Sequence, residues 1–469
     1  MNDRLLFPRG YPLAVMVKFE RDRVEGDGFM QLLYGLRGAV WLLVYLLFIL
    51  APLFALLAGS HPPLRDFWTE LSVAFGYSGL AMMGLQFGLT ARFRYVTEPW
   101  GEDVIYHFHR QISLVAAGLV VAHPIILVAV QPQLLAPSNM LEAPLTAHFA
   151  LVSIACVIAL VVTALWRVSL KISYEKWHLI HVVLAVVAII AGIVHMVGSS
   201  FYLVDPWKRS LWIGLTVFWI GLLFYVRIVK PLFMLRRPYR VAEVRKERGD
   251  TFTLVMQPDR HPGFRFSPGQ FGWLTLWESP FAITAHPFSF SSSAQAADGC
   301  VEMTIRNLGD FTRNIHKVPA GQRVYLDGPY GAFTIGNPAD MHVLVAGGIG
   351  VTPMMSMIRT LADREDPRPV VLLYGVQDWA SITFREELEE LKVRLRLTVV
   401  YVLSRPPDGW TGETGFINAE MFKRYLTPPY ADHEYFICGP NIMMDAIEKA
   451  LGEMNVPMSK YHSERYSFV

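Results

Sequence analysis

Cysteine is scarce in this chain of 469 residues. The three cysteines are Cys156, Cys300 and Cys438, and no two of them form a CxxC pair. A cysteine-based zinc site, an iron–sulfur cluster or a disulfide framework needs more cysteines at closer spacing. The sequence therefore excludes these three kinds of site.

A large charge of one sign is also absent. The net charge is only +2, and no long basic run occurs, so a nucleic-acid partner is not indicated. The N-terminal region lacks the layout of a signal peptide, and we expect residues 1–36 to be a cytoplasmic extension. The stretch from Arg21 to Gly28 lacks the ligand spacing of an EF-hand, so calcium control is not indicated.

Apolar residues are abundant, at 53% of the chain, but they are unevenly distributed. Long uncharged runs recur up to about Ile228, whereas charges, glycines and prolines become frequent after Arg236. A chain of this length is also too long for one ordinary domain. We therefore predict a multi-domain membrane protein with a boundary near residues 230–240.

Six segments are long and apolar enough, or nearly so, to be membrane helices, which need roughly 20 such residues. They are Gly38–Ala58, Leu71–Ala91, Gln111–Val130, Pro144–Trp166, Trp177–Val204 and Leu211–Val226. Most flanking cations lie at one set of ends, and the other set has only Arg65, Lys208 and Arg209. The positive-inside rule then places both termini in the cytoplasm. We predict an all-α six-helix domain over residues 37–232, in the cell inner (plasma) membrane.

Four histidines in these segments form two pairs with equal spacing. Fourteen residues separate His109 from His123, and fourteen separate His181 from His195. On a helix this is nearly four turns, so each pair shares one face, about 21 Å apart. The two helices are predicted to run in the same direction. We therefore expect an inner pair, His109 with His181, and an outer pair, His123 with His195, which suit the irons of two haem b groups.

Other histidines fit this pattern less well. His107 is 16 residues from His123, and His178 is 17 residues from His195, so neither shares a face as closely. His148 stands alone. There are alternatives to the haem interpretation. The histidines could only bond neighbouring helices, or they could be proton relays in a transporter or channel. The protein could also be a cytochrome subunit that a separate reductase serves. Ionisable groups inside a bilayer are costly and usually functional, which favours the haem hypothesis.

Short alternating strands separated by glycine and proline begin near Tyr239. They are expected at Arg240–Val244, Thr251–Met256, Gly272–Leu276, Val301–Arg306 and Arg323–Leu326. This pattern predicts a small antiparallel β-barrel over residues 238–336.

Two motifs in this region carry candidate ligand-binding groups. In His286-Pro287-Phe288-Ser289, the phenyl ring can stack on a planar ring and the hydroxyl can bond a ring nitrogen. Thr312 and the backbone amides beyond Gly309 can bind phosphate at a helix start. The alternative is an ordinary barrel strand with turn residues.

Strands and helices alternate after Asp340. Strands are expected at Met341–Ala346, Val370–Tyr374, Leu397–Leu403 and Glu434–Ile437. Helices are expected to end at about Leu361 and to begin at about Thr383 and at Asn441. This alternation predicts a Rossmann-like α/β domain with a parallel sheet over residues 340–469, which binds its ligand at the carboxyl ends of the strands.

The loops after these strands predict a dinucleotide site. The residues that follow the first strand and open its helix include Gly347, Gly348, Gly350, Thr352 and Pro353. Glycines at this place let a pyrophosphate come close to the backbone at the start of the helix. The sequence differs from the usual dinucleotide-binding motif GxGxxG.

Two further loops refine the choice of nucleotide. Ser404 and Arg405 can hold a 2′-phosphate, which favours NADPH over NADH, and a solvated loop arginine is the alternative. Cys438, which precedes Gly439 and Pro440, is interpreted as a wall of the nicotinamide pocket rather than a redox thiol.

With these motifs the chain resembles the NADPH oxidase and ferric reductase superfamily, especially its bacterial members, from about Arg37 to the C-terminus. The run Glu175-Lys176-Trp177-His178-Leu179-Ile180-His181 resembles the family's fifth-span start, with His181 as ligand. The resemblance implies FAD at the His286–Ser289 motif, with Ser289 near the flavin ring. It further implies nicotinamide contacts at Gly347–Pro353 and Cys438–Pro440, and Phe468 as the aromatic that shields the flavin.

The resemblance implies electron transfer from cytoplasmic NADPH through FAD and two haems to an extracytoplasmic acceptor. Oxygen, giving superoxide, is the first choice, and chelated ferric iron is the alternative. Val469 follows Phe468, where the animal oxidases end on the aromatic, and the fourteen-residue spacing leans toward the reductases. Gln377-Asp378 stands where some members place an arginine, so NADH stays an alternative donor. Besides the bilayer and a small-molecule acceptor, no obligate partner is expected.

Overall fold

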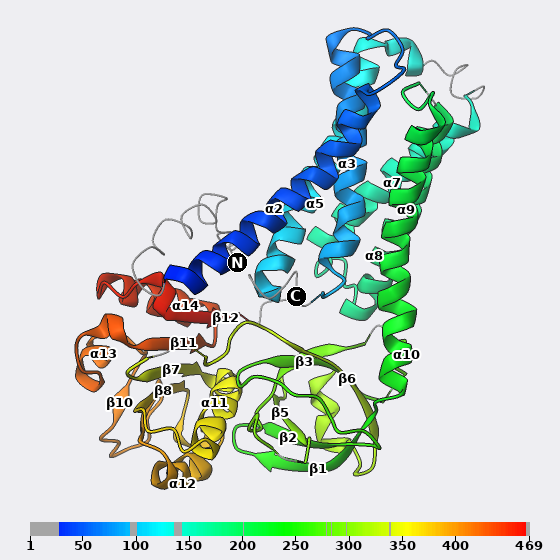
Figure 1. The fold of residues 1–469 in the computed structure, drawn as a ribbon. Coiled ribbons are helices and arrows are strands. Elements are labelled where there is room, and N and C mark those ends of the chain that lie inside the picture. Colours follow the sequence, from blue (N-terminus) through cyan, green and yellow to red (C-terminus); the bar gives the residue numbers. More distant parts are fainter. Residues whose placement is uncertain are drawn as a thin grey trace. The chain divides into compact units, whose positions relative to one another are not determined.

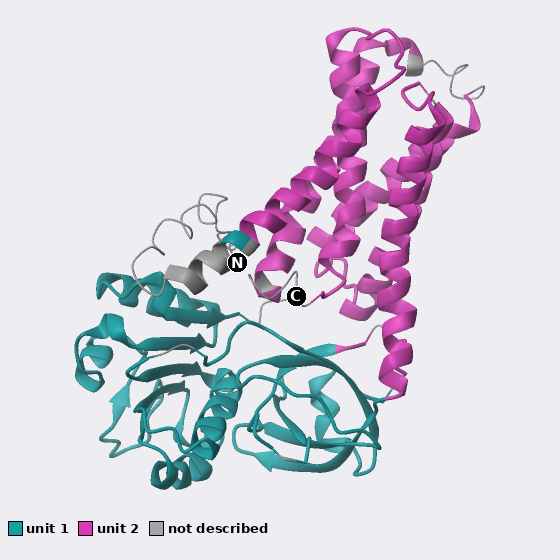
Figure 2. Ribbon diagram, in the orientation of Figure 1, with its two compact units in different colours: residues 1–37, 237–277, 286–468 teal, residues 38–236, 278–285, 469 magenta. Residues whose placement is uncertain are grey.

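The computed structural model describes residues 28–93, 101–135, 143–199, 201–277, 279–282, 284–296, 298–336 and 339–465. It divides into two compact units (Figure 2). The helical unit comprises Gly38–Arg236 and Glu278–Ala285, and the sheet unit comprises Arg237–Trp277 and His286–Phe468, with short terminal segments assigned to each.

The long helices of the chain precede all of its strands (Figure 1). Within the described ranges they are α2 (Gly28–Leu57), α3 (Phe67–Leu89), α5 (Glu102–Val130), α7 (Leu145–Leu165), α8 (Tyr174–Ser199) and α9 (Pro206–Phe224). The last helix continues through a π-helical turn, η2 (Tyr225–Val229), into α10 (Lys230–Leu235). This continuous helix is much longer than the predicted span Leu211–Val226, because it begins at a proline that suits a first turn.

Five of these helices are long and apolar enough to cross a membrane, judged over the described residues. They are Gly38–Leu57, Val104–Val130, Leu145–Leu165, Tyr174–Ser199 and Pro206–Leu235. The chain is thus a multi-pass membrane protein by length and composition. α3 is not among the five, because Glu70, Tyr77 and Gln86 interrupt its apolar sequence. The predicted count of six spans is therefore not confirmed.

Small residues let α3 approach its neighbours closely. A Cβ on Gly84 would overlap the indole of Trp219 on α9, and one on Gly79 would lie 2.7 Å from Cγ2 of Val120 on α5. Close approach through small residues is a common way for membrane helices to associate. α3 therefore packs against both α5 and α9.

The first six strands form one sheet, in the order β4-β3-β6-β1-β2-β5. They are β1 (Tyr239–Glu247), β2 (Thr251–Pro258), β3 (Phe271–Thr275), β4 (His286–Ser289), β5 (Val301–Arg306) and β6 (Arg323–Tyr330). All pairings are antiparallel, as predicted. Closure into a barrel is not confirmed, because within the described residues a single isolated bridge, Phe290 to Met303, connects the chain after β4 to β5.

The remaining six strands form a parallel sheet, in the order β10-β9-β8-β7-β11-β12. They are β7 (His342–Gly347), β8 (Val370–Val376), β9 (Leu397–Leu403), β10 (Glu413–Thr414), β11 (Glu434–Cys438) and β12 (Tyr461–Glu464). The predicted parallel sheet is confirmed, although the short strands β10 and β12 were not predicted.

Helices cover both faces of this parallel sheet. The side chains of Leu344 and Ala346 on β7 share a core with α11 (Val351–Asp363) and α12 (Arg385–Arg394). Those of Val343 and Val345, which point to the opposite face, share a core with α13 (Ala419–Tyr425) and α14 (Asn441–Glu453). Successive side chains of a strand point to opposite faces, so an uninterrupted apolar strand needs this double cover.

Candidate functional site

His109 on α5 and His181 on α8 meet inside the helical unit. Their ring centres are 6.4 Å apart, with the ring planes at 67°. Two metal–nitrogen bonds of about 2 Å, with about 1 Å from each nitrogen to its ring centre, span about 6 Å. The inner pair is thus spaced to hold one metal ion between two imidazoles.

The described residues contain no group of three or more His, Cys, Asp or Glu side chains that could hold a metal ion. Two histidines alone do not complete the coordination of a protein-bound metal. A haem iron needs only axial ligands from the protein, because the macrocycle supplies the others. The donor set of the inner pair therefore fits a haem better than a bare ion.

A hydrogen bond to Gln86 on α3 orients His109. Its Nδ1 lies 2.8 Å from Oε1 of Gln86, which also accepts from Oγ of Ser113 at 3.3 Å. The amide nitrogen of Gln86 is bonded to the carbonyl of Met82 at 2.8 Å, so its oxygen faces the histidine. Because that oxygen only accepts, Nδ1 of His109 carries the hydrogen and Nε2 keeps the lone pair that a metal requires.

Backbone carbonyls orient the outer pair. Nδ1 of His123 lies 2.8 Å from the carbonyl oxygen and 3.0 Å from Oγ of Ser72, and Nδ1 of His195 lies 3.0 Å from the carbonyl oxygen of Thr146. A Cβ on Gly76 would lie 3.2 Å from Cγ of His123, so this glycine lets the ring pack on α3. Both Nε2 atoms are thereby left free to bind a metal. Unlike the inner pair, the two outer rings are not in ring-to-ring contact in the described structure.

The other membrane histidines are placed differently. Nε2 of His178 accepts a hydrogen bond from Nη2 of Arg227 at 2.9 Å, so this nitrogen is already engaged. His107 and His148 are exposed, and Nδ1 of His148 lies 3.4 Å from the carbonyl oxygen of Pro144. From the sequence, Arg227 was recognised only as a cation that flanks a membrane span. Its contact with His178 joins two helices, and no sequence pattern predicts it.

The His286–Ser289 motif forms β4, the edge strand of the antiparallel sheet. Phe311 lies beside it: its ring centre is 4.0 Å from that of His286, 6.0 Å from that of Phe288 and 5.6 Å from that of Trp277. Ser289 is buried. The motif therefore lies in an aromatic cluster to which Phe311 and Trp277 contribute, and the sequence analysis missed both.

Thr312 closes the loop before a short helix, η3 (Thr312–Lys317). Its Oγ1 accepts from the backbone amides of Leu308 and Gly309, each at 2.9 Å. These two amides are bonded within the loop. Any phosphate contact here therefore falls to amides beyond Gly309.

The glycine-rich loops after β7 and β11 lie against each other. A Cβ on Gly439 would lie 3.0 Å from Cα of Gly347, and one on Gly350 would overlap the carbonyl of Cys438. The strand order reverses between β7 and β11, and nucleotides bind at such switch points of doubly wound sheets. The structure thus brings the predicted pyrophosphate loop and the Cys438-Gly439-Pro440 motif to one crevice.

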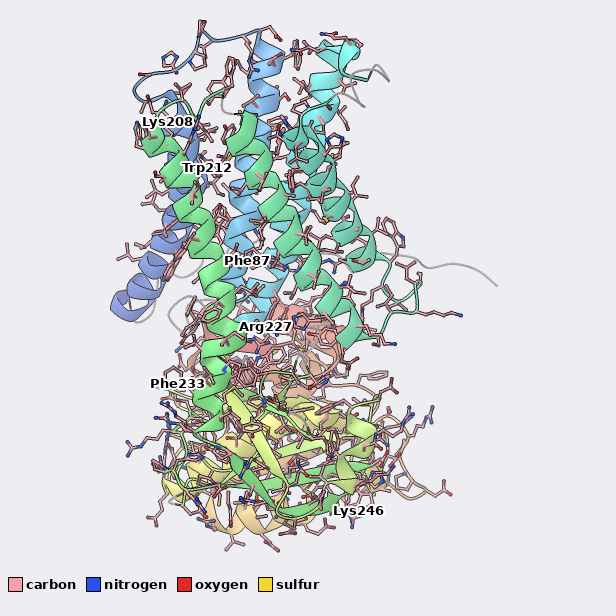
Figure 3. The ribbon with its side chains drawn as sticks, turned by 90° about the vertical axis from the view of Figure 1, so that its right-hand side faces the viewer. Phe87, Lys208, Trp212, Arg227, Phe233 and Lys246 are labelled. Atoms are coloured by element: carbon pink, nitrogen blue, oxygen red, sulfur yellow. The ribbon has the colours of Figure 1, made fainter. Side chains whose placement is uncertain are left out.

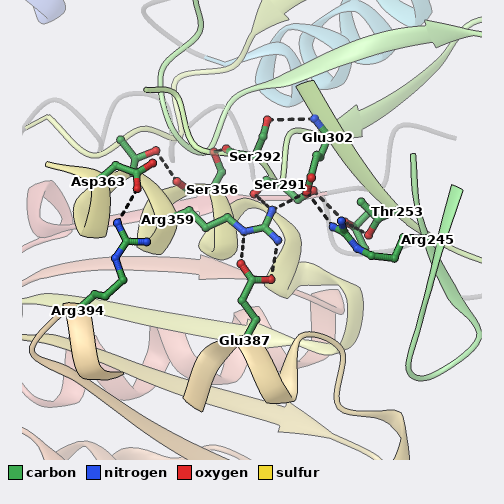
Figure 4. Close-up of polar contacts among 12 residues, drawn as sticks. Arg245, Thr253, Ser291, Ser292, Glu302, Ser356, Arg359, Asp363, Glu387 and Arg394 are labelled. Carbon is green, nitrogen blue, oxygen red and sulfur yellow. Dashed lines mark hydrogen bonds and ion pairs between the residues drawn. The ribbon is translucent and has the colours of Figure 1, made fainter. Parts of the chain in front are cut away.

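The helix that opens at this crevice, α11, is clamped to the antiparallel sheet (Figure 4). Nη1 of Arg359 lies 2.8 Å from Oε2 of Glu302 on β5, and its Nε and Nη2 each lie 2.6 Å from the carboxylate of Glu387 on α12. Although burial opposes it, these carboxylates raise the pKa of Arg359. Other hydrogen bonds join Thr352 to Thr304, Ser356 to Ser292 and Thr360 to Ala294.

Two cysteines of the sheet unit differ in setting. Burial, followed by a hydrogen bond and the charge of Asp298, raises the pKa of Cys300 to about 12. A thiol with this pKa is almost fully protonated at neutral pH, so it is a poor nucleophile. Cys438 is fully buried at the end of β11, a position that fits a pocket wall.

The last predicted nucleotide contacts lie at the end of β9. Ser404 and Arg405 are exposed there, and the amide of Arg405 donates to the carbonyl of Gln377 at 2.7 Å. This places them at the carboxyl edge of the parallel sheet, beside the end of β8. Phe468 lies outside the described residues.

Three family models match successive parts of the chain. A ferric reductase like transmembrane component matches residues 75–192, an FAD-binding domain matches 236–334, and an oxidoreductase NAD-binding domain matches 344–449. The chain is a fusion of the NADPH oxidase and ferric reductase type. The match to the membrane component includes three of the four paired histidines, and His195 lies just beyond its end. The FAD-binding match contains the aromatic cluster. The NAD-binding match contains the glycine crevice.

Relatives match parts of the fusion. The glycine betaine monooxygenase reductase subunit of Pseudomonas aeruginosa is 29% identical over 241 residues, which cover 49% of this chain and 64% of that protein. NADH-cytochrome b5 reductase 1 of Laccaria bicolor is 32% identical over 173 residues, which cover 35% of this chain and 56% of that protein. The chain thus spans less than two thirds of the length of these relatives.

Among solved structures, the flavohemoglobin of Malassezia yamatoensis matches with a TM-score of 0.47 and 17% identity, over 86% of this chain and 99% of that one. A cytochrome P450 reductase of Amycolatopsis matches with a TM-score of 0.44 and 25% identity, over 49% of this chain and 69% of that one.

Proposed function

We propose that this protein transfers electrons from cytoplasmic NADPH, through FAD and two bis-histidine haems, to oxygen on the far side of the membrane. The observation that carries the proposal is the inner pair, whose rings are 6.4 Å apart. The hydrogen bonds that leave Nε2 free on His109, His123 and His195 support it. When bound, the flavin and haems would supply two-electron acceptance from a nicotinamide and one-electron transfer.

We infer that α3 is the sixth membrane span. The polar residues that lower its hydropathy are engaged inward: Gln86 meets His109, and Ser72 meets His123. Polar groups inside a bilayer usually face the bundle interior and serve function. The helix is thus less apolar because it orients one histidine of each pair, rather than because it lies outside the membrane.

Flanking charge orients the bundle. Cations gather at one set of helix ends, namely at Arg92, Arg110, Arg167, Lys171, Lys176, Arg227 and Lys230. The positive-inside rule assigns these ends to the cytoplasmic side of the cell inner membrane. His109 and His181 then lie near the cytoplasmic face, and the sheet unit follows α10 on the same side.

Residues of the sheet unit would hold the electron donor and the flavin. Gly347, Gly350 and Gly439 have no side chains of their own that would keep a pyrophosphate from their backbone, although the Met443 side chain packs against Gly347 and Gly439. Phe288 presents a ring for stacking, and the clamp at Arg359 fixes α11 on the antiparallel sheet. The donor site and the flavin motif are thereby held in one unit.

The outer-end cations favour a neutral acceptor. Nζ of Lys208 lies 2.9 Å and 2.7 Å from the carbonyl oxygens of Leu56 and Ser60, and the side chain is fully buried. Nε of Arg65 lies 3.3 Å from the carboxylate of Glu70. The charges of Lys208 and Arg65 are already compensated within the protein, so an anionic ferric chelate would gain little from them. Of the three outer-end cations this leaves Arg209, which is exposed and whose Nε donates to the carbonyl oxygen of Leu203 at 2.7 Å. Oxygen needs no such charge.

The test is an absorption spectrum combined with an acceptor assay on purified, haem-replete protein. We expect a haem Soret band, and NADPH-driven cytochrome c reduction that superoxide dismutase suppresses. Absence of a Soret band would contradict the electron path. A fast reduction of ferric citrate with no dismutase-sensitive signal would contradict the choice of oxygen and favour ferric-chelate reduction.

A further inference from the structure

Beside His181, whose own Nδ1 is also unpartnered among the described residues, three nitrogen donors are buried without an acceptor. They are Nε1 of Trp177 and Nδ1 of His178 on α8, and Nε of Arg227 on η2; none has a hydrogen-bond partner within the described part of the chain. Leaving one buried donor unpaired is unfavourable, and buried donors in proteins are almost always satisfied. Three together indicate that an acceptor is missing from this place.

The three donors are neighbours of the inner pair. The ring of Trp177 is 5.2 Å from that of His181 and 6.4 Å from that of His178. Nη2 of Arg227 lies 2.9 Å from Nε2 of His178. An arginine only donates, so Nε2 of His178 accepts and Nδ1 carries the hydrogen. The missing acceptor therefore lies beside the histidine expected to bind the inner haem.

Arg227 is also a charge without a counter-charge. It forms no ion pair with any described carboxylate. Lys208 lies on the same continuous helix, roughly 28 Å from Arg227 (Figure 3). Unlike Arg227 it has a carboxylate partner, because its Nζ lies 3.5 Å from Oδ2 of Asp205. A π-helical turn carries Arg227, and such turns are rare and frequently mark functional sites. An uncompensated guanidinium with unpaired donors around it calls for an anion.

We propose that Arg227, His178 and Trp177 form an anion site whose occupant is a propionate carboxylate of the haem held by His109 and His181. The assignment rests on the proposed function. A carboxylate accepts several hydrogen bonds at once, and arginine matches its geometry. A lipid phosphate has the same chemistry, and the experiment separates these two sources.

The primary test is a spectroelectrochemical titration of both haems in the purified full-length protein. Arg227→Leu should shift the midpoint potential of the inner haem to a lower value and leave the outer haem unchanged, because a positive charge favours the reduced state. Arg227→Lys should keep most of the wild-type potential. The inner haem is identified by the signal that His109→Ala removes.

Lys176→Leu is the matched control. It removes one cation from the first turns of α8, next to Trp177, but its side chain is exposed. Both potentials should stay at the wild-type values. If Arg227→Leu does not accumulate, Arg227→Gln removes the same charge with a polar side chain and carries the same expectation.

A second arm replaces haem with its dimethyl ester, which has no propionate charge. With the wild-type protein, the ester should dissociate from the inner site faster than haem does, and Arg227→Leu should abolish this difference, because the substitution and the ester remove the same contact. A difference that Arg227→Leu leaves undiminished would assign the site to a lipid phosphate and overturn the propionate assignment. Two haems with unshifted potentials in both Arg227→Leu and Arg227→Gln would overturn the anion site itself. A wild-type protein without haem would instead overturn the proposed function.

Discussion

The inner and outer histidine pairs have the same sequence spacing but different surroundings. In the inner pair the two rings are in contact, His109 is held by the Gln86 side chain, and Nδ1 of His181 has no partner among the described residues. In the outer pair both Nδ1 atoms are held by backbone carbonyls, and Oγ of Ser72 also lies 3.0 Å from Nδ1 of His123. A side-chain partner is lost with one substitution, whereas a carbonyl survives any change of its residue. The inner site is therefore open to side-chain tuning, and the outer site is fixed by the backbone.

The largest expected effect tests whether the pairs are separate sites at all. His195→Ala should remove one haem and abolish acceptor reduction, while NADPH still reduces the flavin, because only the last carrier is lost. Haem content per chain and flavin bleaching under anaerobic conditions measure the two outcomes. His148→Ala, in an exposed histidine of α7, is the control and should keep both haems. Retention of both haems in His195→Ala would mean that another residue is the ligand.

The second prediction tests the difference in orienting groups. Gln86→Leu should weaken haem binding at the inner pair by about 10–100-fold, the usual cost of losing a partner of a metal-bound histidine. Ser72→Ala removes the hydroxyl 3.0 Å from Nδ1 of His123 but should have little effect on the outer haem, because the shorter contact to the Ser72 carbonyl remains. Haem dissociation can be followed by transfer to apomyoglobin. Equal losses in the two variants would remove the distinction between the pairs.

The third prediction concerns the supply of electrons, which should reach both pairs alike. Arg405→Ala should raise the KM for NADPH about tenfold and leave the KM for NADH unchanged, because a guanidinium contact to a 2′-phosphate is lost. Steady-state kinetics with each nucleotide provide the measurement, and both haem potentials should stay constant. An equal rise for NADH would show that Arg405 does not discriminate between the two nucleotides.

The smallest expected effect concerns the outer end. Lys208→Met should lower the free energy of unfolding by about 2 kcal/mol, since the carbonyls of Leu56 and Ser60 lose a charged donor. Thermal denaturation in detergent measures the change, with the exposed Lys171→Met as control. Both haem potentials should be unaffected. A lowered outer potential in Lys208→Met would show that this lysine acts on the haem rather than on the loops.

Local pattern was enough to predict the longer strands. Val301–Arg306 and Leu397–Leu403 were predicted with the bounds that the structure shows, because alternation and β-branched residues mark them. The same signals missed β10 and β12, which are two and four residues long, and the seven-residue helix α13. Elements this short carry too few residues for a periodic pattern.

The histidine pairs were visible as a spacing, but their partners were not. Gln86 and Ser72 lie on α3, far along the chain from the rings they contact, and nothing in their own neighbourhood marks them as acceptors. Arg227 meets His178 only because α8 and η2 pack together. Contacts between helices depend on the folded bundle, so the sequence alone predicted the candidate ligands without the groups that orient them.

The measurement that tests the central claim most directly is the number of haems per chain in the purified wild-type protein, determined by the pyridine haemochrome assay. Two histidine pairs, each holding one iron, predict two haems per chain with bis-histidine spectra. A protein that binds none, or only one under haem-replete expression, would contradict this account.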